Sequence, residues 1–259
     1  MADEMNSYFA VAQQALARIE QGQQEAIERA AERMAESIAA DRLVHVFGTG
    51  HGSFAPLESF PRSGGIVGFH PIVELPLALL HHIYGDMGVP QYRYLHRQEG
   101  YGQAILESHH LDPRDCLALF SHSGLNAVIL DMAIEAKRRG LTVVGVTSLP
   151  HTMAVQPRHS SGKRLAEIAD IVIDTGVPLG DAGIQVAGVS DPLGPVSTVC
   201  AVAIMHALIC ATARHLVARG VEPLVEVNVN VPREGSARAQ NNRNYAEQWK
   251  RQSVLPGED

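Results

Sequence analysis

The chain has 259 residues, of which 46% are hydrophobic, 19% are charged and only 5% are aromatic, and its formal net charge is −7. This length and composition are typical of one large α/β domain, or of one domain with appendages. The negative charge and the few aromatic rings argue against a nucleic-acid-binding protein, which needs cations for phosphates and flat rings for stacking. An anionic ligand would have to be attracted by local groups, because the long-range field opposes it.

The cysteines and the amino-terminal segment bear on the compartment. Cys116, Cys200 and Cys210 all fall in apolar runs, and none forms a CxxC pair. Reduced thiols of this kind favour a cytoplasmic protein. The acidic amino-terminal segment does not resemble a signal peptide, and no run of 18 or more apolar residues predicts a membrane span. We therefore expect a cytoplasmic protein that contacts neither membrane nor nucleic acid.

The first segment, residues 3–40, is predicted to be helical, because Ala, Glu, Gln and Arg dominate it and its apolar residues recur at helical spacing. Gly22 is a point at which the segment could divide into two helices. We interpret residues 1–40 as a helical arm that packs on the main domain or pairs with a second subunit.

Five short apolar segments, each bounded by turn residues, are predicted to be strands: 43–47, 64–70, 116–120, 141–148 and 169–176. Helical segments alternate with them, most clearly at 126–139 and 198–218. This alternation predicts an α/β fold, a three-layer α/β/α sandwich around a five-stranded parallel sheet, over residues 41–220. Residues 221–259 are expected to form an extension, with the strand-like LVEVNVNV followed by a polar, exposed end.

A glycine-rich loop, GTGHGS, follows the first predicted strand at residues 48–53. Ligands of open parallel sheets bind outside the carboxyl ends of the strands, which is where this loop falls. Its glycine spacing fits neither the dinucleotide motif nor a phosphate-binding P-loop. Two interpretations stay open: the glycines only ease a tight turn, or Gly48, Gly50, His51 and Ser53 belong to a ligand loop in which His51 and Ser53 meet a sugar.

A serine-rich turn follows the third predicted strand, where a helix begins. Ser121, His122 and Ser123 lie in it, and Asn126 stands at the start of the helix. Hydroxyls together with the free N–H groups of a helix amino terminus can hold a phosphate without lysine or arginine. The alternative is an ordinary helix cap. Thr147 and Ser148 follow the next strand and add hydroxyls at the same edge of the sheet.

The two loops together carry a resemblance. Gly-x-Gly-x-x-Ser after the first strand, with Ser-x-Ser-Gly-x-Asn opening a helix, resembles the sugar isomerase (SIS) domain family. Longer stretches, such as VIDTGVPLGDA and GPVSTVCAVAIMHAL, resemble a group of bacterial SIS proteins of unassigned reaction. The resemblance implies the SIS fold, and a phosphosugar whose phosphate is bound by the serine loop. Asn126 stands where the family usually has Ser or Thr.

Two further residues are candidate acid–base catalysts. The spacing of Glu58 and Arg62 resembles that of phosphoheptose isomerases, in which the glutamate is an acid–base catalyst; otherwise the two form an i,i+4 surface pair. Pro61 interrupts this stretch, so we expect the helix to end early. His206 lies in the apolar run VCAVAIMHALICATA, where it is either a core residue or, as the same resemblance implies, a catalytic histidine.

Several histidines are candidate metal ligands. The adjacent pairs His81–His82 and His109–His110 make poor chelates, because neighbouring side chains on a helix point about 100° apart. His51 and His122, each in a ligand loop, could contact sugar hydroxyls or a divalent ion. We predict no metal and no cofactor. Asp181, in GVPLGDAGI, resembles a residue of the same family; orienting a neighbouring chain is one role open to it, and the sequence assigns it no firm one.

The function favoured by these patterns is an aldose–ketose isomerase that acts on a sugar phosphate through an enediolate. Glu58 would be the base beside the carbon, and His206 the second proton carrier. Two alternatives remain: a phosphosugar sensor without chemistry, and a phosphosugar deaminase or etherase. The resemblance also implies a homodimer or homotetramer, with the helical arm and helix 198–218 as contact surfaces.

Overall fold

A five-stranded parallel sheet lies at the centre of the computed structural model, which describes residues 2–78 and 88–253. Its strands follow the order β2 (Phe69–Pro71), β1 (Val44–Gly48), β3 (Cys116–Phe120), β4 (Thr142–Thr147) and β5 (Ile171–Asp174). All five residues of β1 and of β3 are buried. The predicted α/β class and five-stranded sheet are confirmed, because near-continuous apolar strands need cover on both faces.

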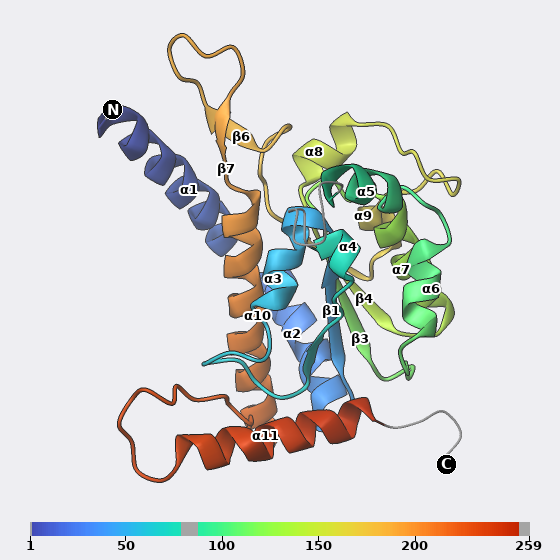
Figure 1. Cartoon of the computed structure of the whole chain (residues 1–259), viewed down its shortest axis with the longest axis vertical. Helices are drawn as coiled ribbons and strands as arrows, with labels where there is room; N and C mark the ends of the chain where they lie inside the picture. Colours follow the sequence, from blue (N-terminus) through green and yellow to red (C-terminus); the bar gives the residue numbers. More distant parts are fainter. Residues whose placement is uncertain (1, 79–87, 254–259) are drawn as a thin grey trace.

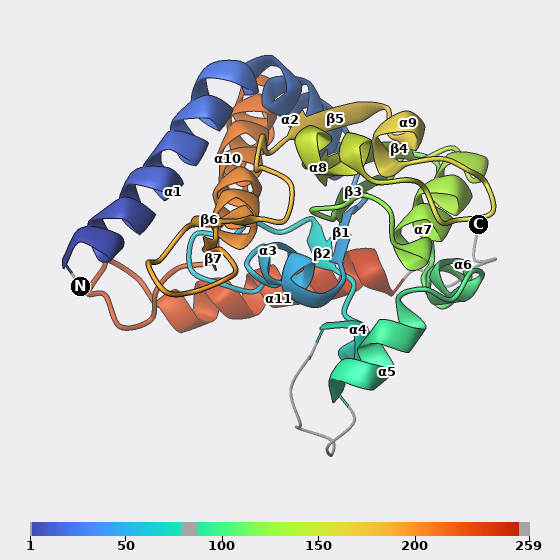
Figure 2. The same cartoon turned by 90° about the horizontal axis from the view of Figure 1, so that it is seen from above.

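Helices cover both faces of this sheet (Figures 1 and 2). On one face lie α2 (Gln24–Ala39) and α10 (Ser197–Ala218), and on the other α6 (Tyr101–Glu107), α7 (Ala127–Arg138) and α9 (Leu165–Ile168). Side chains alternate along each strand. Ala118 of β3 therefore joins the core beneath α2 and α10, whereas Leu117 and Leu119 join the core beneath α6 and α7.

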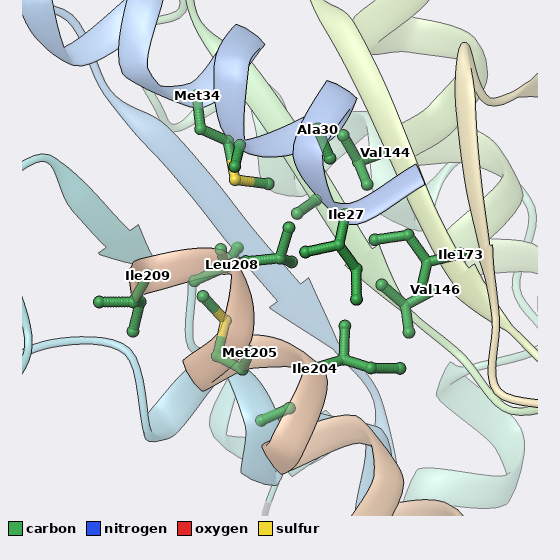
Figure 3. Close-up of a cluster of buried hydrophobic side chains, with 14 of the residues drawn as sticks. Ile27, Ala30, Met34, Val144, Val146, Ile173, Ile204, Met205, Leu208 and Ile209 are labelled. Atoms are coloured by element: carbon green, nitrogen blue, oxygen red, sulfur yellow. The ribbon is translucent and has the colours of Figure 1, made fainter. Parts of the chain in front are cut away.

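The amino-terminal helices divide as Gly22 predicted, into α1 (Ala2–Gly22) and α2. Figure 3 shows Ile27, Ala30 and Met34 of α2 facing α10 and the strands. Ala30 and Met34 have no solvent exposure, so α2 is a full layer of the sandwich. Only α1 projects in the manner of an arm (Figure 1), although its Ala12, Ala15 and Ile19 reach the same core. The boundary predicted at residue 40 stays a prediction.

Helix α10 is apolar almost all round. Within the described part of the chain it is the one helix long and apolar enough to cross a membrane, a test of length and composition that core helices also pass. Its Ile204, Met205 and Leu208 are buried against α2 and the sheet. Packing in the core of this domain therefore accounts for apolar residues of α10.

Short elements at the carboxyl edge of the sheet complete the site. They are η1 (Gly50–Ser53), α3 (Phe54–Leu57), α4 (Leu75–Ala78), α5 (Gly88–Leu95) and α8 (Leu149–Ala154). An antiparallel hairpin of β6 (Ala182–Ile184) and β7 (Leu193–Pro195) precedes α10 and was not predicted. Helix α3 ends at Leu57, before Pro61, as expected.

The carboxyl-terminal extension differs from its prediction. LVEVNVNV does not form a regular strand: Val225 makes an isolated bridge with Ile66, and backbone hydrogen bonds join Glu226 to Gly64 and Gly65, and Leu224 to Val67. The polar segment that follows is helix α11 (Ala237–Gln252), capped by Ser236. It crosses the end of the sheet opposite the site (Figure 1), and its Gln248 is buried. The contact between α11 and the sheet is made by the amide side chain of Gln248. Hydrophobic periodicity in the sequence does not reveal it, because an amide counts there as a surface residue.

Candidate functional site

A cavity of about 220 Å³, here called the central cavity, lies at the carboxyl ends of the strands. This is the edge at which ligands of open α/β sheets bind. Its titratable residues are His51, Tyr92, His122 and Asp181. Its remaining polar side chains are hydroxyls and one amide, from Thr49, Ser121, Ser123, Asn126, Thr175, Ser197 and Thr198. Among the described residues, the lining contains neither lysine nor arginine, so neutral donors and helix amino termini would have to hold an anion.

The serine loop between β3 and α7 supplies four of these residues. The amide of Ser121 donates to the Val146 carbonyl at 3.0 Å, and its hydroxyl accepts from the amide of Gly124 at 3.1 Å. Gly124 has a left-handed φ of +62°, and a Cβ there would lie 2.8 Å from Oγ1 of Thr147. The loop is thus held tightly against β4, with its residues lining the cavity.

Asn126 stands at the N-cap position of α7 with an extended backbone, but its side chain makes no capping hydrogen bond. Its amide therefore remains available toward the cavity it lines. The first N–H groups of a helix have no intrahelical acceptor and carry partial positive charge. Ser121, Ser123 and Asn126 therefore line the cavity beside this helix end, and their role in holding an oxyanion stays a prediction.

The glycine loop after β1 shapes the opposite wall. A Cβ on Gly48 would lie 2.2 Å from the Gly52 carbonyl oxygen, and one on Gly50 would lie 2.6 Å from the hydroxyl of Tyr92. Gly48 and Gly50 do not line the cavity themselves; they allow Tyr92 to approach and turn His51 toward it. Burial raises the pKa of Tyr92, so its phenol stays a neutral hydrogen-bonding group.

Three predicted contact residues hold the loops instead of lining the cavity. The hydroxyl of Ser53 donates to the Gly50 carbonyl at 2.6 Å, and that of Thr147 donates to the His122 carbonyl at 3.1 Å. Ser148 caps α8, accepting from the amide of His151 at 3.1 Å, and donates to the Val177 carbonyl. All three are buried, because the backbone turns they stabilise close over them.

His122 occupies the wall of the central cavity. Neither of its ring nitrogens has a hydrogen-bond partner among the described residues, although both atoms are buried. Its ring contacts that of His151 edge-on, with 4.5 Å between centroids. Burial lowers the pKa of His122, the charge of Asp181 partly opposes this, and His151 reinforces it. A neutral imidazole with one donor and one acceptor therefore remains to meet a ligand.

Asp181 organises the start of α10. Its carboxylate accepts from the amides of Val196 and Ser197, at 3.0 and 2.8 Å, and from the Ser197 hydroxyl. Its backbone has a left-handed φ of +72°, a strained conformation for a non-glycine residue. Asp181 thereby places Ser197 and Thr198 in the cavity wall, a role that the sequence had left open.

Glu58, Arg62 and His206 form one cluster between α3 and α10. The Oε2 atom of Glu58 lies 3.6 Å from Nε2 of His206, and the same carboxylate pairs with Arg62. Burial, and then the charge of Arg62, lower the pKa of His206. The side chains of Glu58 and His206 are 39% and 40% exposed, and neither lines the central cavity. The two predicted catalysts are thus brought together, outside the predicted phosphate cradle.

The structure also bears on metal binding. Over residues 2–78 and 88–253, no group of three or more His, Cys, Asp or Glu side chains is arranged to hold a metal ion. The pair His81–His82 lies outside the described residues. His51 and His122 both line the central cavity, where they would face a ligand.

Several lining residues were missed from the sequence. Thr49 sits inside the glycine loop, and Thr175 directly follows β5, so position alone could have indicated both. Ser197 and Thr198 open α10, where helix-start signals could have drawn attention to them. Tyr92 comes from α5, a segment without a readable pattern, and only the fold brings it to the cavity.

The parallel sheet, its two helical layers and a cavity lined by hydroxyls at the carboxyl edge define an α/β protein with a candidate ligand site. The chain belongs to the SIS domain family, whose model matches residues 7–148. It is 34% identical to a UPF0309 protein of Halalkalibacterium halodurans over 89% of this chain and 93% of that protein. It is also 34% identical to a UPF0309 protein of Streptomyces griseus, over 83% of this chain and 84% of that one.

Solved structures show the same fold. The phosphoheptose isomerase of Neisseria gonorrhoeae aligns with a TM-score of 0.54 and 15% identity, covering 81% of this chain and 97% of that one. The phosphoheptose isomerase of Francisella tularensis aligns with a TM-score of 0.50 and 18% identity, covering 83% and 98%. The resemblance predicted from the two loops is confirmed at the level of family and fold.

Proposed function

We propose that this protein binds a sugar phosphate with its phosphate in the cradle of Ser121, Ser123 and Asn126. The single observation that carries this proposal is that these side chains line one cavity at the amino end of α7. Ordinary helix caps bind their own backbone, whereas Asn126 makes no capping hydrogen bond. Membership of the SIS family, and a fold shared with phosphoheptose isomerases, support the same ligand class.

The reaction we propose is aldose–ketose isomerisation. It moves one proton between neighbouring carbons, so it needs a base at carbon and a group that exchanges protons with the oxygens. Glu58 would take the carbon proton, and His206, whose lowered pKa favours the neutral ring, would serve the oxygens. Helix α10 connects the two regions: Thr198 lines the cavity, and His206 lies about 12 Å further along the helix axis at 1.5 Å per residue. The sugar would therefore extend along α10.

A second candidate function is a sugar-phosphate sensor without chemistry. The placement of Glu58 and His206 outside the central cavity favours it, since a ligand confined to the cavity would not touch them. A short ligand would then bind in the central cavity, and a partner protein would respond to the bound state. The first experiment is a thermal-shift screen of sugar phosphates, which identifies ligands that bind the folded state.

Proton exchange separates the candidates. With the best ligand in deuterated water, an isomerase incorporates deuterium at C1 or C2 and forms the partner sugar. A sensor does neither, and a deaminase or etherase releases ammonia or the ether substituent as well. Binding without exchange would refute the isomerase, and the absence of any sugar-phosphate binding would refute the whole proposal.

We also propose that the chain forms a homodimer or homotetramer through α10. An apolar groove of about 280 Å³ runs between α1, α2 and α10, with Leu16, Ile27 and Ala207 in its lining. On the same helix, Val199 and Val217 are 40% and 64% exposed. Light scattering should give a dimer or tetramer for the parent chain and a smaller species for Ala207→Glu. A monomeric parent chain would refute this. The cytoplasmic location stays a prediction.

A further inference from the structure

A second cavity adjoins the central cavity at the β3–α7 loop. This outer cavity has a volume of about 360 Å³, and its lining includes His96, Arg97 and Arg158. Ser123 and Asn126 line both cavities. The amino end of α7 therefore stands between two cavities, and only the central one is accounted for by the proposed phosphate cradle.

His96 indicates that the outer cavity is a binding site. The residue is only 8% exposed, and its Nδ1 atom is buried without a well-aligned hydrogen bond among the described residues, although the Tyr92 backbone, one turn earlier, interacts weakly with the ring. Buried polar atoms in folded proteins are almost always hydrogen-bonded, so an unpartnered one beside a cavity points to a missing ligand. The carbonyl of His96 already accepts from the amide of Val128 in the first turn of α7, at 3.4 Å. This contact fixes His96 against the helix end.

The charges around the outer cavity favour an anion. Arg97 and Arg158 are exposed, and neither has an ion-pair partner within the described part of the chain. The opposing carboxylate, Glu99, accepts both the amide and the hydroxyl of Ser160. Within the described residues, two guanidinium groups without a carboxylate partner thus lie near one carboxylate that already has donors. The same face receives the partial positive charge of the α7 terminus.

The rim of the outer cavity is preorganised by contacts within the protein. Nε2 of His159 lies 3.1 Å from Oδ1 of Asp131, which ties the 155–160 loop to α7. The guanidinium of Arg164 donates to the carbonyls of Thr152 and Val155, at 3.0 and 3.2 Å. These contacts hold the walls in place, so binding needs little reordering of the backbone.

We propose that the outer cavity is a second oxyanion site, which binds a phosphate group through Arg97, Arg158 and Nδ1 of His96. Guanidinium groups match phosphate oxygens in pairs, and the imidazole N–H supplies one further donor. The proposal does not depend on the central cavity binding a sugar phosphate, since the three residues named here line the outer cavity alone.

The test uses inorganic phosphate and the full chain, with stoichiometry and affinity measured by titration calorimetry at low ionic strength. The variants are Arg97→Ala/Arg158→Ala, His96→Gln and, for the central cavity, Ser121→Ala. Arg93→Ala is the matched control, because Arg93 is an exposed arginine of α5 that does not line the outer cavity. Circular dichroism checks that each variant is folded.

We expect two phosphates per chain, one of which is weakened about tenfold or more in the double arginine variant and in His96→Gln. Arg93→Ala should keep both. One phosphate that is lost in the arginine variant but kept in Ser121→Ala would support the outer site and refute the central cradle. Parent-like binding in both the arginine and histidine variants, or a loss no larger than in Arg93→Ala, would overturn the proposal.

Discussion

Nε2 of His206 lies 3.6 Å from Oε2 of Glu58, although the two residues belong to α10 and α3. The contact exists because α3 follows the glycine loop directly and packs on α10, beside the edge of the sheet that carries the central cavity. The resemblance to phosphoheptose isomerases predicted that these two side chains act together, and the structure brings them into contact. Arg62 pairs with the same carboxylate.

Glu58→Gln should lower isomerase turnover about 100-fold or more, because a positioned proton acceptor contributes that much to such reactions. Sugar-phosphate affinity should stay within about threefold, since the variant keeps the size of the side chain. Deuterium incorporation measures the first effect and calorimetry the second. Glu36→Gln, which alters an exposed pair with Arg33, is the control. Full activity in Glu58→Gln would show that Glu58 is not the base of the reaction.

Ser123→Ala should affect ligand binding, whereas Ser148→Ala should affect stability. Ser123 lines the cavities, so its loss should weaken phosphate binding about tenfold with little change in stability. Ser148 is fully buried and caps α8, so its loss should lower the free energy of unfolding by about 1–3 kcal/mol without changing affinity. Urea unfolding and calorimetry distinguish the two, and equal effects in both assays would contradict these assignments.

Gly48→Ala should both destabilise the protein and abolish ligand binding. The added methyl group would lie 2.2 Å from the Gly52 carbonyl oxygen and 3.0 Å from that of Phe120. Displacing this loop should cost about 1–3 kcal/mol. Gly22→Ala is the control, because no heavy atom lies within 4 Å of the new methyl group. Thermal unfolding with and without ligand makes the comparison, and a Gly48→Ala protein that behaves like Gly22→Ala would disprove the steric argument.

Acid should destabilise the fold through His70. Its Nδ1 lies 3.0 Å from that of His45, and burial, followed by the charges of His45 and His109, lowers its pKa from 6.5 to about 3. Between these values the unfolded chain binds a proton that the folded one does not, so stability falls as the pH drops below about 6.5. Asp115 partly opposes the shift.

The contribution of His70 is at most about 1.4 kcal/mol per pH unit between pH 6.5 and 3. Urea unfolding at several pH values should therefore show a shallower acid loss in His70→Asn than in the parent chain. Parallel stability curves over that range would show that His70 does not titrate as described.

Gln248→Ala should loosen the attachment of α11 to the sheet. The side-chain oxygen of Gln248 accepts from the amide of Gly68 at 2.8 Å, and its nitrogen donates to the carbonyl of Phe69 at 3.1 Å. Truncation leaves two backbone groups without partners, at about 1–3 kcal/mol each. Trp249→Ala, at a residue 70% exposed, should change stability by less than about 0.5 kcal/mol. Hydrogen exchange in α11 and urea unfolding report the difference.

Much of the site could be predicted because its residues follow strands. His51, Ser121, His122, Ser123 and Asn126 were predicted, and all line the central cavity. Ser53, Thr147 and Ser148 occupy equivalent positions in the sequence but bind neighbouring backbone atoms. A hydroxyl can serve a turn or a ligand equally well, and only the path of the loop decides which.

The order of apolar segments and turns was enough to determine the parallel sheet, its helical layers and the edge that carries the site, because burial on two faces leaves few other arrangements. Contacts between distant segments were decided by the tertiary structure alone. Such contacts bring Asp181 to the start of α10 and Gln248 to Gly68, and leave Nδ1 of His96 beside the outer cavity. Polar contacts of this kind depend on direction and distance in space, which periodicity in a sequence does not encode.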